Sequence, residues 1–347
     1  MLNLLFISGS FPPQEDGVAD FGEKLFFELK KIATVDIVYF DKKANNMLLN
    51  NHYKVSNWGW KTLYNLHKAS QKNSYDRILL QAPAHGYEGS ILIGFYSLFF
   101  RVFSRKKLVI YLHEYSNRTF IGKTKLALLC SFVHKIIIND ERYIPELKKF
   151  FFFPKKIQTV FEPVGSNISV SSVTCKKSDI YKIGYFGMVR PGKGTDKLFD
   201  VLNLVQQKTS KKVELHFMGK VLNPELVSQE NSAVFFRGKI EENKISEAFS
   251  EMNIFLQLFD EGLTGKRGSF IAPFLSCKPV ITTKPKTRVW EFVCDKNTSF
   301  VDDLSEASLI EISNKILDDI NGKAPLPSLN KEHKINIWGD IAKSVLN

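Results

Sequence analysis

Short apolar segments rich in β-branched residues alternate with longer helical patterns along this chain, and no other feature restricts its fold as strongly. Such alternation is typical of βαβ units stacked around a parallel sheet. Two series occur. The first predicts strands at 2–8, 35–40, 76–82, 107–112, 134–139 and 157–161 with a helix at 21–31, and the second at 182–187, 213–218, 233–237, 253–257, 279–282 and 298–301. We therefore expect an α/β chain of two doubly wound domains.

A segment of linker composition separates the two series. Residues 162–168 are followed by a polar stretch, rich in Ser and Lys, that extends to residue 179. We place the first domain at residues 1–165 and the second at 166–332. The final segment, 333–347, has a helical pattern but is too short for a third unit, so we expect it to pack on one of the two domains.

Neither the cysteines nor the apolar segments indicate an exported or membrane-spanning chain. The four cysteines are scattered without a CxxC or Cys/His spacing, which favours reduced cytoplasm over a disulfide framework or a structural zinc. The first seven residues lack the basic start and cleavage site of a signal peptide. The longest apolar run, 91–103, is shorter than the roughly 20 residues that span a bilayer. We expect a cytoplasmic protein.

The net charge of +12 is concentrated in the first half of the chain. Residues 1–168 carry 23 Lys and Arg against 14 Asp and Glu, whereas residues 169–347 carry 25 against 22. An acidic partner is therefore indicated: nucleic acid, an anionic membrane surface or a phosphorylated substrate. Nucleic acid is the least favoured of these, because the sequence contains no recognisable nucleic-acid-binding module.

Four phenylalanines at 150–153 lie between two pairs of lysines at 148–149 and 155–156. Aromatic side chains could enter a membrane interface here while the lysines meet anionic headgroups, which predicts peripheral contact with a membrane. The alternative is that Phe151 and Phe153 are core residues of a strand.

The strongest chemical motif follows the strand predicted at 182–187. Gly187, Arg190, Lys193 and Gly194 precede a helix rich in Leu and Val. Glycines let the backbone approach a phosphate, a helix N-terminus favours anions, and two cations neutralise a diphosphate. The motif is neither a Walker loop nor the dinucleotide GxGxxG. An ordinary strand-to-helix loop with incidental charge is the alternative.

A second glycine-rich loop follows the strand predicted at 253–257. Gly265, Arg267, Gly268 and Ser269 lead into an apolar helix and again describe an anion site. Upstream, Glu261 is a candidate for holding sugar hydroxyls, because a carboxylate accepts two hydrogen bonds at once. The alternative is a plain surface role for Glu261.

The two loops resemble motifs of the retaining glycosyltransferases of family 4. Residues 187–194 look like the Gly-Arg-x-x-Pro-x-Lys-Gly stretch of that family, and 261–282 is similar to its Glu-rich donor loop with the following Gly-x-Pro-Val-Val. Further matches are 164–168 at the hinge and 338–342 in a final helix, which in this family crosses back to the N-terminal domain. The resemblance covers essentially the whole chain. It implies the GT-B fold, two Rossmann-like domains facing a central cleft.

The sequence departs from the family pattern at two positions. Met188 stands where the family has a phosphate-binding Arg, and Ala272 stands where it has a second Glu. The chain is similar to a subgroup with an Arg-Gly-Ser donor loop and a small residue at the second position. Arg190 is the candidate substitute for the missing cation.

The resemblance also suggests roles for residues of the first half. His113 fits a His that contacts the donor sugar near the anomeric centre, although a lone His after a strand is otherwise more often structural. Glu114 is expected to orient the acceptor hydroxyl, to act as a base, or to cap the following segment. Gly17 and Asp20 resemble part of the flexible first loop of the family, whose Gly backbone meets the donor phosphate or the acceptor, so we expect both to lie at the acceptor. Helix capping is the alternative for Asp20. We place Gln81 at the acceptor edge.

The resemblance implies a retaining hexosyltransferase that uses a nucleotide-sugar donor and no cofactor. No Asp-x-Asp motif occurs, so we expect no metal, and Lys193, Arg190 and Arg267 to stabilise the leaving diphosphate. With His113 and Glu261, Lys193 forms the expected catalytic set. The expected acceptor is a glycan, such as one linked to undecaprenyl diphosphate in bacterial O-antigen or capsule assembly at the cytoplasmic face of the membrane.

Two other functions remain open. One is a GT-B sugar-nucleotide epimerase, which would use several acidic residues around the sugar, whereas only Glu261 is a candidate here. The other is a catalytically inactive glycosyltransferase-like partner, in which Met188 and Ala272 are relics of lost binding.

Overall fold

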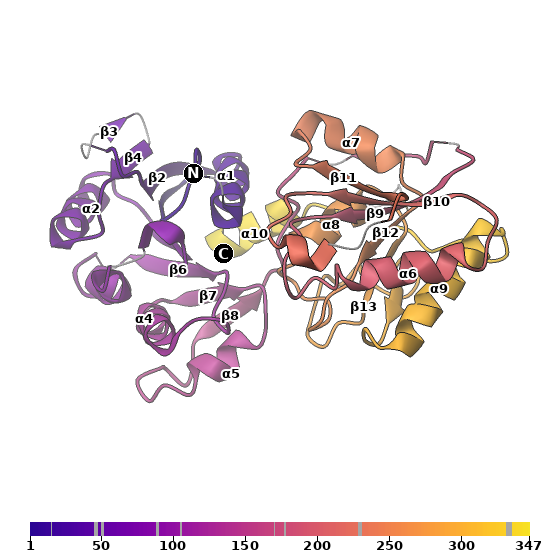
Figure 1. Cartoon of the computed structure of the whole chain (residues 1–347). Coiled ribbons are helices and arrows are strands. Elements are labelled where there is room, and N and C mark those ends of the chain that lie inside the picture. The colour runs from indigo at the N-terminus through magenta and orange to yellow at the C-terminus, as the bar shows by residue number, and fades with distance from the viewer. Residues whose placement is uncertain are drawn as a thin grey trace. The chain divides into compact units, whose positions relative to one another are not determined.

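The chain folds into two compact units (Figure 1). The first comprises Met1–Asn167 and Asn336–Asn347, and the second Ile168–Ile335. The computed structural model describes residues 1–14, 16–44, 48–49, 52–87, 90–104, 106–169, 171–176, 178–227, 231–330 and 335–347. The start predicted for the last helix, His333, lies outside the described residues, and the helix observed there begins at Ile337.

The first unit is built on an eight-stranded sheet in the order β3-β4-β2-β1-β5-β6-β7-β8, in which only the β3–β4 pair is antiparallel. Its strands are β1 (Leu2–Ser8), β2 (Ala33–Phe40), β3 (Leu48–Leu49), β4 (His52–Val55), β5 (Arg77–Ala82), β6 (Lys107–Leu112), β7 (Lys135–Ile138) and β8 (Gln158–Phe161). Its helices are α1 (Gly17–Lys30), α2 (Trp60–Lys72), α3 (Tyr96–Phe99), α4 (Phe120–Ser131), α5 (Tyr143–Leu147) and α10 (Ile337–Leu346).

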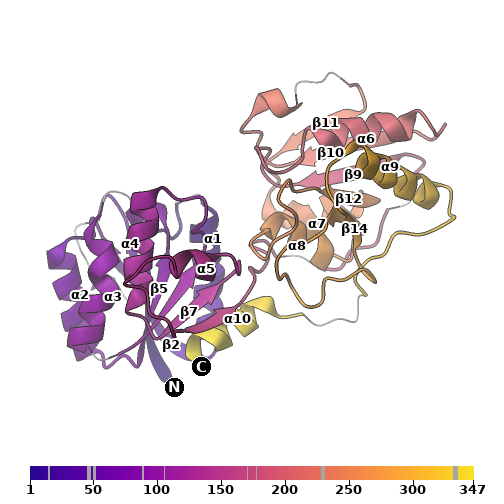
Figure 2. The ribbon, with the colours of Figure 1, turned by 90° about the horizontal axis from the view of Figure 1, so that it is seen from below.

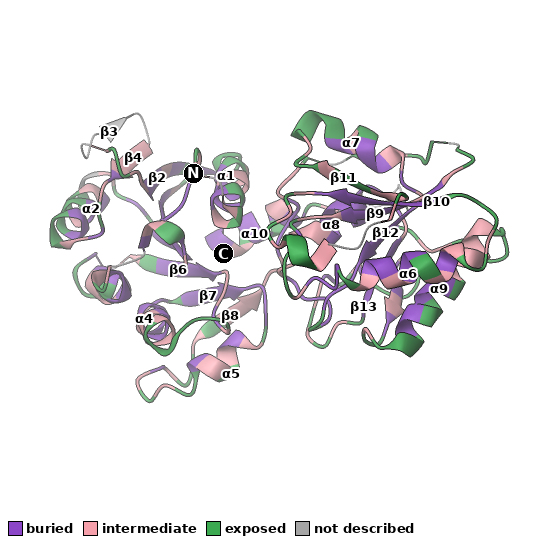
Figure 3. Ribbon diagram, viewed as in Figure 1, coloured by how far each residue is buried: buried purple, intermediate pink, exposed green. Residues whose placement is uncertain are grey.

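The second unit is built on a six-stranded parallel sheet in the order β11-β10-β9-β12-β13-β14. Its strands are β9 (Tyr181–Phe186), β10 (Val213–Met218), β11 (Val234–Gly238), β12 (Ile254–Gln257), β13 (Val280–Thr283) and β14 (Ser299–Val301). Its helices are α6 (Lys197–Gln206), α7 (Glu242–Ser250), α8 (Gly268–Leu275) and α9 (Glu306–Ile320). Figure 3 shows the central strands of both sheets buried, as expected for parallel sheets covered by helices.

The terminal helix α10 is part of the first unit, where Figure 2 shows it beside the strands of that sheet. Trp338 on this helix donates through its indole Nε1 to the carbonyl of Ser166 at 3.0 Å, and its ring centroid lies 4.9 Å from that of Phe21. At the other end of α10, Arg77 donates to the carbonyl of Val345 at 3.3 Å, and Lys135 to that of Ser344 at 3.0 Å. Cations at a helix C-terminus satisfy its last carbonyls and complement its dipole.

All twelve predicted strands are present within two residues of their predicted bounds. The short edge strands β3 and β4 were not predicted. Helix α1 begins four residues before its predicted start at Phe21, because Asp16 caps it: the carboxylate accepts from the backbone N–H groups of Val18 and Ala19. Asp20 lies inside the helix, so its predicted alternative role as the cap was wrong. Within the described ranges, no helix is both long and apolar enough to cross a bilayer.

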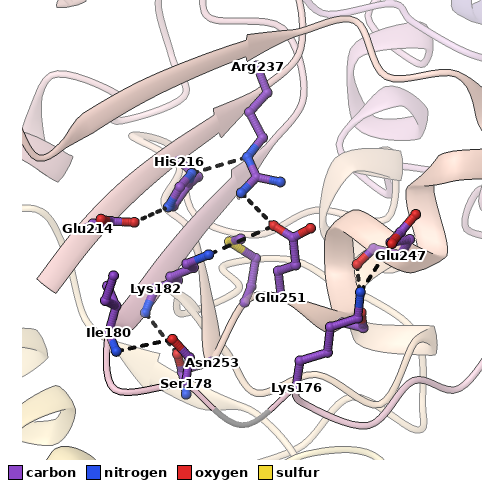
Figure 4. Close-up of polar contacts among 12 residues, drawn as sticks. Lys176, Ser178, Ile180, Lys182, Glu214, His216, Arg237, Glu247, Glu251 and Asn253 are labelled. Carbon is purple, nitrogen blue, oxygen red and sulfur yellow. Dashed lines mark hydrogen bonds and ion pairs between the residues drawn. The ribbon is translucent and has the colours of Figure 1, made fainter.

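A polar network joins the edge of the second sheet to α7 (Figure 4). Arg237 on β11 donates through Nε to His216 Nδ1 at 3.1 Å and through Nη2 to Glu251 Oε2 at 2.7 Å. Because His216 Nδ1 must accept, the ring proton lies on Nε2, which donates to Glu214 Oε2 at 3.1 Å. Burial and the neighbouring Arg237 lower the pKa of His216 to about 4, which keeps the ring neutral at physiological pH.

This network predicts a loss of stability in mild acid. The pKa of folded His216 lies below its ordinary value of 6.5, so the unfolded chain takes up the proton first. The stabilisation that neutral His216 gives the folded state is therefore complete above pH 6.5 and is lost as the pH falls to 4. The unfolding free energy should fall by about 3 kcal/mol over this range. Urea melts of wild type and His216→Gln at pH 7 and pH 4.5 test this. The Gln side chain can make both hydrogen bonds without titrating, so the pH effect should shrink, and an equal loss in both proteins would contradict the assignment.

Candidate functional site

The strand order of the second sheet places a topological switch point between β9 and β12. The chain leaves β9 toward β10 on one side, and β12 returns on the other side of β9. Ligands of open α/β sheets bind beyond the carboxyl ends of the strands at such a point. The two strand ends are tied together there, since Gln257 Nε2 donates to the carbonyl of Phe186 at 3.0 Å. Both predicted glycine-rich loops therefore leave the sheet at its expected binding edge.

Lys193 joins the two loops. Its buried ammonium lies 3.2 Å from Ser269 Oγ in the first turn of α8, and 5.0 Å from the ring centroid of Phe259. The Arg267 guanidinium lies 4.7 Å from the same centroid. Among the described residues Lys193 forms no ion pair with a carboxylate. The loops thus gather two cations around one aromatic ring at a helix N-terminus, where the backbone also favours negative charge.

The electrostatics of this cluster favour an anion. Burial, followed by the positive charges of Arg267, Arg190 and Lys266, holds the pKa of Lys193 well below its usual value. A buried cation surrounded by other cations is unfavourable in the empty protein, and an anion placed among them would remove the repulsion. The cluster can therefore act as a binding site for a diphosphate.

Glycines allow the backbone of the first loop to lie against α8. Gly187 has a φ of +129°, and a Cβ added there would lie 2.9 Å from Ser269 Cβ. Gly194 has a φ of +53°, and its added Cβ would lie 2.9 Å from Leu258 Cβ. Side chains at either position would force the two loops apart.

We predict that Gly187→Ala destabilises the protein by about 2–4 kcal/mol, the sum of backbone strain and crowding against Ser269. Gly192 is the matched control. It also has a positive φ, +81°, but an added Cβ would meet nothing within 4 Å, so Gly192→Ala should cost only about 1–2 kcal/mol. Chemical denaturation of the two variants measures the difference. Equal losses would show that Gly187 is not packed against α8 as described.

The remaining residues predicted to bind the donor occupy the same loops. Gly265 is buried in the loop after β12, and Gly268 opens α8. Arg190 is exposed, as is Glu261 in the turn that follows β12. Of the two departures from the family pattern, Met188 is exposed in the loop after β9, whereas Ala272 is fully buried in α8.

The residues predicted in the first unit divide into a buried and an accessible set. Gln81 on β5 is fully buried, and its Nε2 donates to the carbonyl of Val18 at 2.6 Å, which holds the first turn of α1. Gly17 and Asp20 are exposed in that same turn. The proposed contact of Gln81 with an acceptor stays a prediction, and its burial favours a role in positioning α1.

His113 directly follows β6. Its ring meets that of Phe21 edge-on at 4.5 Å between centroids and lies 4.7 Å from that of Tyr111. Burial lowers the pKa of His113 to about 3, so the ring is neutral at physiological pH. Its Nε2 is buried and has no hydrogen-bond partner among the described residues. A neutral imidazole nitrogen held in this way can bind a hydroxyl.

Glu114 organises the chain after His113. Its carboxylate accepts from the backbone N–H of Tyr115 at 3.1 Å. The following helix α4 is capped instead by Thr119, whose Oγ1 accepts from Gly122 N at 3.2 Å. Glu114 therefore caps a local turn and not a helix.

Two residues were missed by sequence reasoning. The ring of Phe259 lies under both Lys193 and Arg267, and the sequence signal for it was an aromatic side chain in the loop directly after β12. Asn139 directly follows β7, and His113 directly follows its neighbour β6, just beyond the last registered pair, Leu112 and Ile138. The Oδ1 of Asn139 is buried without a partner in the described part of the chain. Its signal was an amide residue at a strand end, the same rule that selected His113.

The phenylalanine segment at 150–153 is not a strand, so the predicted alternative was wrong for the strand and for Phe151, whereas Phe153 does belong to the core. The segment forms turns after α5, in which Phe153 is buried but Phe151 is 98% exposed. A cavity of about 390 Å³ beside it is lined by Lys148, Lys155 and Lys156 together with Ile144 and residues 157–159.

Comparisons with known proteins identify the fold. No protein-family model matches the chain, and no curated protein matches its sequence. Among solved structures, the chain is similar to sucrose-phosphate synthase from Thermosynechococcus elongatus, with a TM-score of 0.64, 15% identity and coverage of 100% of this chain and 95% of that one. HepE of Anabaena, in complex with UDP and glucose, gives a TM-score of 0.63, 15% identity and coverage of 100% and 96%.

The lipopolysaccharide outer core galactosyltransferase WaaB, in its apo form, gives a TM-score of 0.60, 12% identity and coverage of 99% of this chain and 94% of that one. These structural neighbours are glycosyltransferases, and they match over essentially the whole chain. The chain has the GT-B fold, as the sequence predicted.

Proposed function

We propose that this chain is a glycosyltransferase that moves a sugar from a nucleotide-sugar donor to a glycan or lipid-linked acceptor. One observation carries the proposal: Lys193 and Arg267 meet over Phe259 at the start of α8, at the switch point of the second sheet. The GT-B fold supports it, as does the neighbour HepE, whose solved structure contains UDP and glucose.

Each unit supplies one part of the proposed chemistry. In the second unit, Lys193, Arg267 and the N-terminus of α8 stabilise the diphosphate as it leaves. The exposed Arg190, in the loop after β9, adds positive charge beside them. Ser269, Gly268 and Gly265 shape the loop around it, and Glu261 binds sugar hydroxyls. In the first unit, neutral His113 binds a sugar hydroxyl, and Gly17, Asp20 and Glu114 face the acceptor.

We further propose that the transfer retains the anomeric configuration. The bond from the anomeric carbon to the phosphate oxygen breaks, the bond to the acceptor oxygen forms, and the acceptor proton passes to the leaving phosphate oxygen. No protein nucleophile is then needed. The anomer of the product, determined by NMR, tests this step, and an inverted product would reject it.

The positive charge in this account comes from the protein, so we expect activity to survive removal of metal ions. Cationic side chains and a helix N-terminus can neutralise a diphosphate without Mg²⁺. Transfer assays with and without EDTA measure this, with Mg²⁺ added back as the control. Activity that disappears in EDTA and returns with Mg²⁺ would show that the cation cluster does not suffice.

The proposed function is tested by thermal shift with UDP-, GDP-, ADP- and dTDP-sugars, followed by transfer assays. A ligand present at a hundred times its Kd raises the unfolding free energy by about 2.7 kcal/mol. Stabilisation by one nucleotide class followed by transfer supports the glycosyltransferase. Donor binding without turnover would favour the inactive partner, and interconversion of the donor sugar without an acceptor would favour the epimerase.

We also propose a role in bacterial surface polysaccharide assembly at the cytoplasmic face of the membrane. The lysine pairs at 148–149 and 155–156 support peripheral membrane contact, because all four side chains are exposed beside Phe151. The acceptor would then be a membrane lipid that carries a glycan, for example through undecaprenyl diphosphate.

A further inference from the structure

Two polar side chains stand next to each other at the carboxyl ends of β6 and β7 in the first unit. His113 and Asn139 each come directly after the last registered pair of these strands, Leu112 and Ile138. The ring atom Nε2 of His113 and the amide oxygen Oδ1 of Asn139 are both buried, and neither has a hydrogen-bond partner among the described residues. Buried polar atoms of folded proteins are nearly always paired, so two neighbouring exceptions indicate a place where a polar ligand binds.

The two side chains lie on the same face of the sheet. The rings of Tyr111 and His113, two residues apart, both contact the ring of Phe21 on α1. On β7, Lys135 lies four residues before Asn139, and its ammonium donates to a carbonyl of α10 at 3.0 Å. Helices α1 and α10 contact each other through Phe21. Because side chains alternate between the two faces of a strand, both His113 and Asn139 point to the face that α1 and α10 cover.

The backbone holds His113 and Asn139 in place, so their polar side-chain atoms are not needed for that task. The N–H of His113 donates to the carbonyl of Ala82 at 2.9 Å, and the carbonyl of His113 accepts from the hydroxyl of Tyr143 at 3.0 Å. Asn139 directly follows the four buried residues of β7. Residues fixed on rigid elements in this way present a binding geometry before the ligand arrives.

The charges around the pair favour an uncharged ligand. Burial lowers the pKa of His113 to about 3, so its ring is neutral. Asp140, which follows Asn139, is buried and paired with Arg142 at 2.7 Å. Glu114, which follows His113, adds a second carboxylate. A phosphate or a carboxylate bound here would therefore lie beside two acids and one guanidinium, which disfavours an anion.

One hydroxyl group can satisfy both unpartnered atoms. A hydroxyl donates and accepts, so it can donate to the amide oxygen of Asn139 while it accepts from the ring N–H of His113. Neighbouring strands lie about 4.8 Å apart. Two groups that share one hydroxyl oxygen at ordinary hydrogen-bond lengths are separated by a similar distance.

We infer that Asn139 binds a sugar hydroxyl together with His113 and makes that hydroxyl a requirement of the substrate. The inference rests on the proposed glycosyltransferase function and adds a specificity-determining residue to it. The chemistry of the pair is the same whether the hydroxyl belongs to the donor sugar or to the glycan acceptor, and the substrate analogues used below distinguish these two sources.

The stability of Asn139→Ala without ligand is the first measurement. Its amide oxygen has no partner among the described residues, so its removal should leave the urea concentration at half-unfolding close to that of wild type. Asn73→Ala is the matched control, because the Asn73 amide donates to the hydroxyls of Tyr53 at 3.1 Å and Tyr75 at 3.0 Å. This control should lower the urea midpoint and leave the transfer kinetics unchanged. A loss of stability in Asn139→Ala as large as in the control would show that Asn139 is structural.

Transfer kinetics measure the contact from the side of the enzyme. UDP-glucose, UDP-galactose, GDP-mannose and dTDP-glucose are compared as donors for wild type, and the best of them is used with the variants. Asn139→Ala should lower kcat/KM by at least about tenfold, the effect of one lost hydrogen bond to a substrate hydroxyl.

Monodeoxy analogues of the same donor and of the acceptor remove the hydroxyl from the side of the substrate. With wild type, one analogue should have a kcat/KM at least about tenfold below that of the parent substrate. Wild type and Asn139→Ala should use that one analogue equally well, because the contact is already missing from it. If the sensitive position lies on the donor sugar, His113 and Asn139 bind the donor, and if it lies on the acceptor, they bind the acceptor.

The two proposals fail separately. If wild type transfers a sugar and Asn139→Ala is equally active, or is slowed to the same degree with the parent substrate and with every deoxy analogue, Asn139 does not bind a substrate hydroxyl and the glycosyltransferase remains. If wild type transfers no sugar from any donor, the proposed function is rejected, and the substrate assigned to His113 and Asn139 is rejected with it.

Discussion

The Lys193→Met variant is expected to be more stable than wild type without ligand and to bind the donor at least a hundredfold more weakly. Lys193 is buried, and the charges of Arg267, Arg190 and Lys266 add to the cost of its own charge. An apolar side chain of similar length removes both effects, so we expect a gain of about 1–3 kcal/mol in unfolding free energy. The donor loses a charge-assisted hydrogen bond from the lysine to its diphosphate.

The direction in which the unfolding free energy changes with pH tests the lowered pKa of Lys193 independently. The pKa of folded Lys193 lies well below its ordinary value of 10.5, so the unfolded chain binds the proton more tightly. Stability should therefore rise as the pH approaches 10.5 and should fall as the pH is lowered. This rise should be missing in Lys193→Met.

Lys197→Met is the matched control for both measurements. Lys197 is four residues further along the chain, at the first position of α6, and is partly exposed. Its ammonium lies 3.5 Å from the carboxylate of Asp196. Its replacement should leave stability within about 0.5 kcal/mol of wild type and donor affinity unchanged. If Lys193→Met is less stable than wild type and binds nucleotide as tightly, Lys193 and Arg267 stabilise the fold and do not bind the donor.

Trp338→Ala is expected to destabilise the first unit by about 3–5 kcal/mol. The Trp338 ring packs on Phe21, and its indole donates to Ser166. A Cβ added at Gly165 would lie 2.4 Å from the Trp338 ring, which shows how closely the backbone approaches it. Truncation leaves a cavity beneath α10 and an unpaired carbonyl.

Hydrogen exchange distinguishes the two units in this variant. Amides of α1 and β1 should exchange faster in Trp338→Ala, whereas those of β9 and β12 should be unchanged, because α10 belongs to the first unit. Asp340→Ala, at an exposed position of the same helix, is the control and should have little effect. Equal acceleration in both units would contradict this division of the chain.

Much of the fold was predictable because parallel sheets leave a strong local signal. The strands of such a sheet are buried on both faces, so each appears as a short run of β-branched and aromatic residues between loops. β10 is fully buried along all six residues and was placed without error. β4 is four residues long, lies near the edge and includes the polar His52 and Lys54, so its pattern does not differ from that of a loop.

The site was predictable to the level of loops but not of geometry. Strand-end position and residue type selected Lys193, Arg267 and Ser269. The structure places Lys193 and Arg267 over Phe259 and hydrogen-bonds Lys193 to Ser269. The partner of a side chain depends on tertiary packing. For this reason Gln81, chosen by the same rule, is found holding α1, and Asp16 caps the helix in place of Asp20.

The central claim is that a nucleoside diphosphate binds over Phe259 between Lys193 and Arg267, and calorimetry at pH 9 tests it most directly. Because the pKa of Lys193 is lowered in the empty site, a bound diphosphate should raise it and draw a proton from the buffer. Titration of UDP, GDP, ADP and dTDP in two buffers of different ionisation enthalpy measures that proton. We expect uptake with one nucleotide in wild type and none in Lys193→Met. Binding of no nucleotide, or the same affinity and proton uptake in both proteins, would contradict the claim.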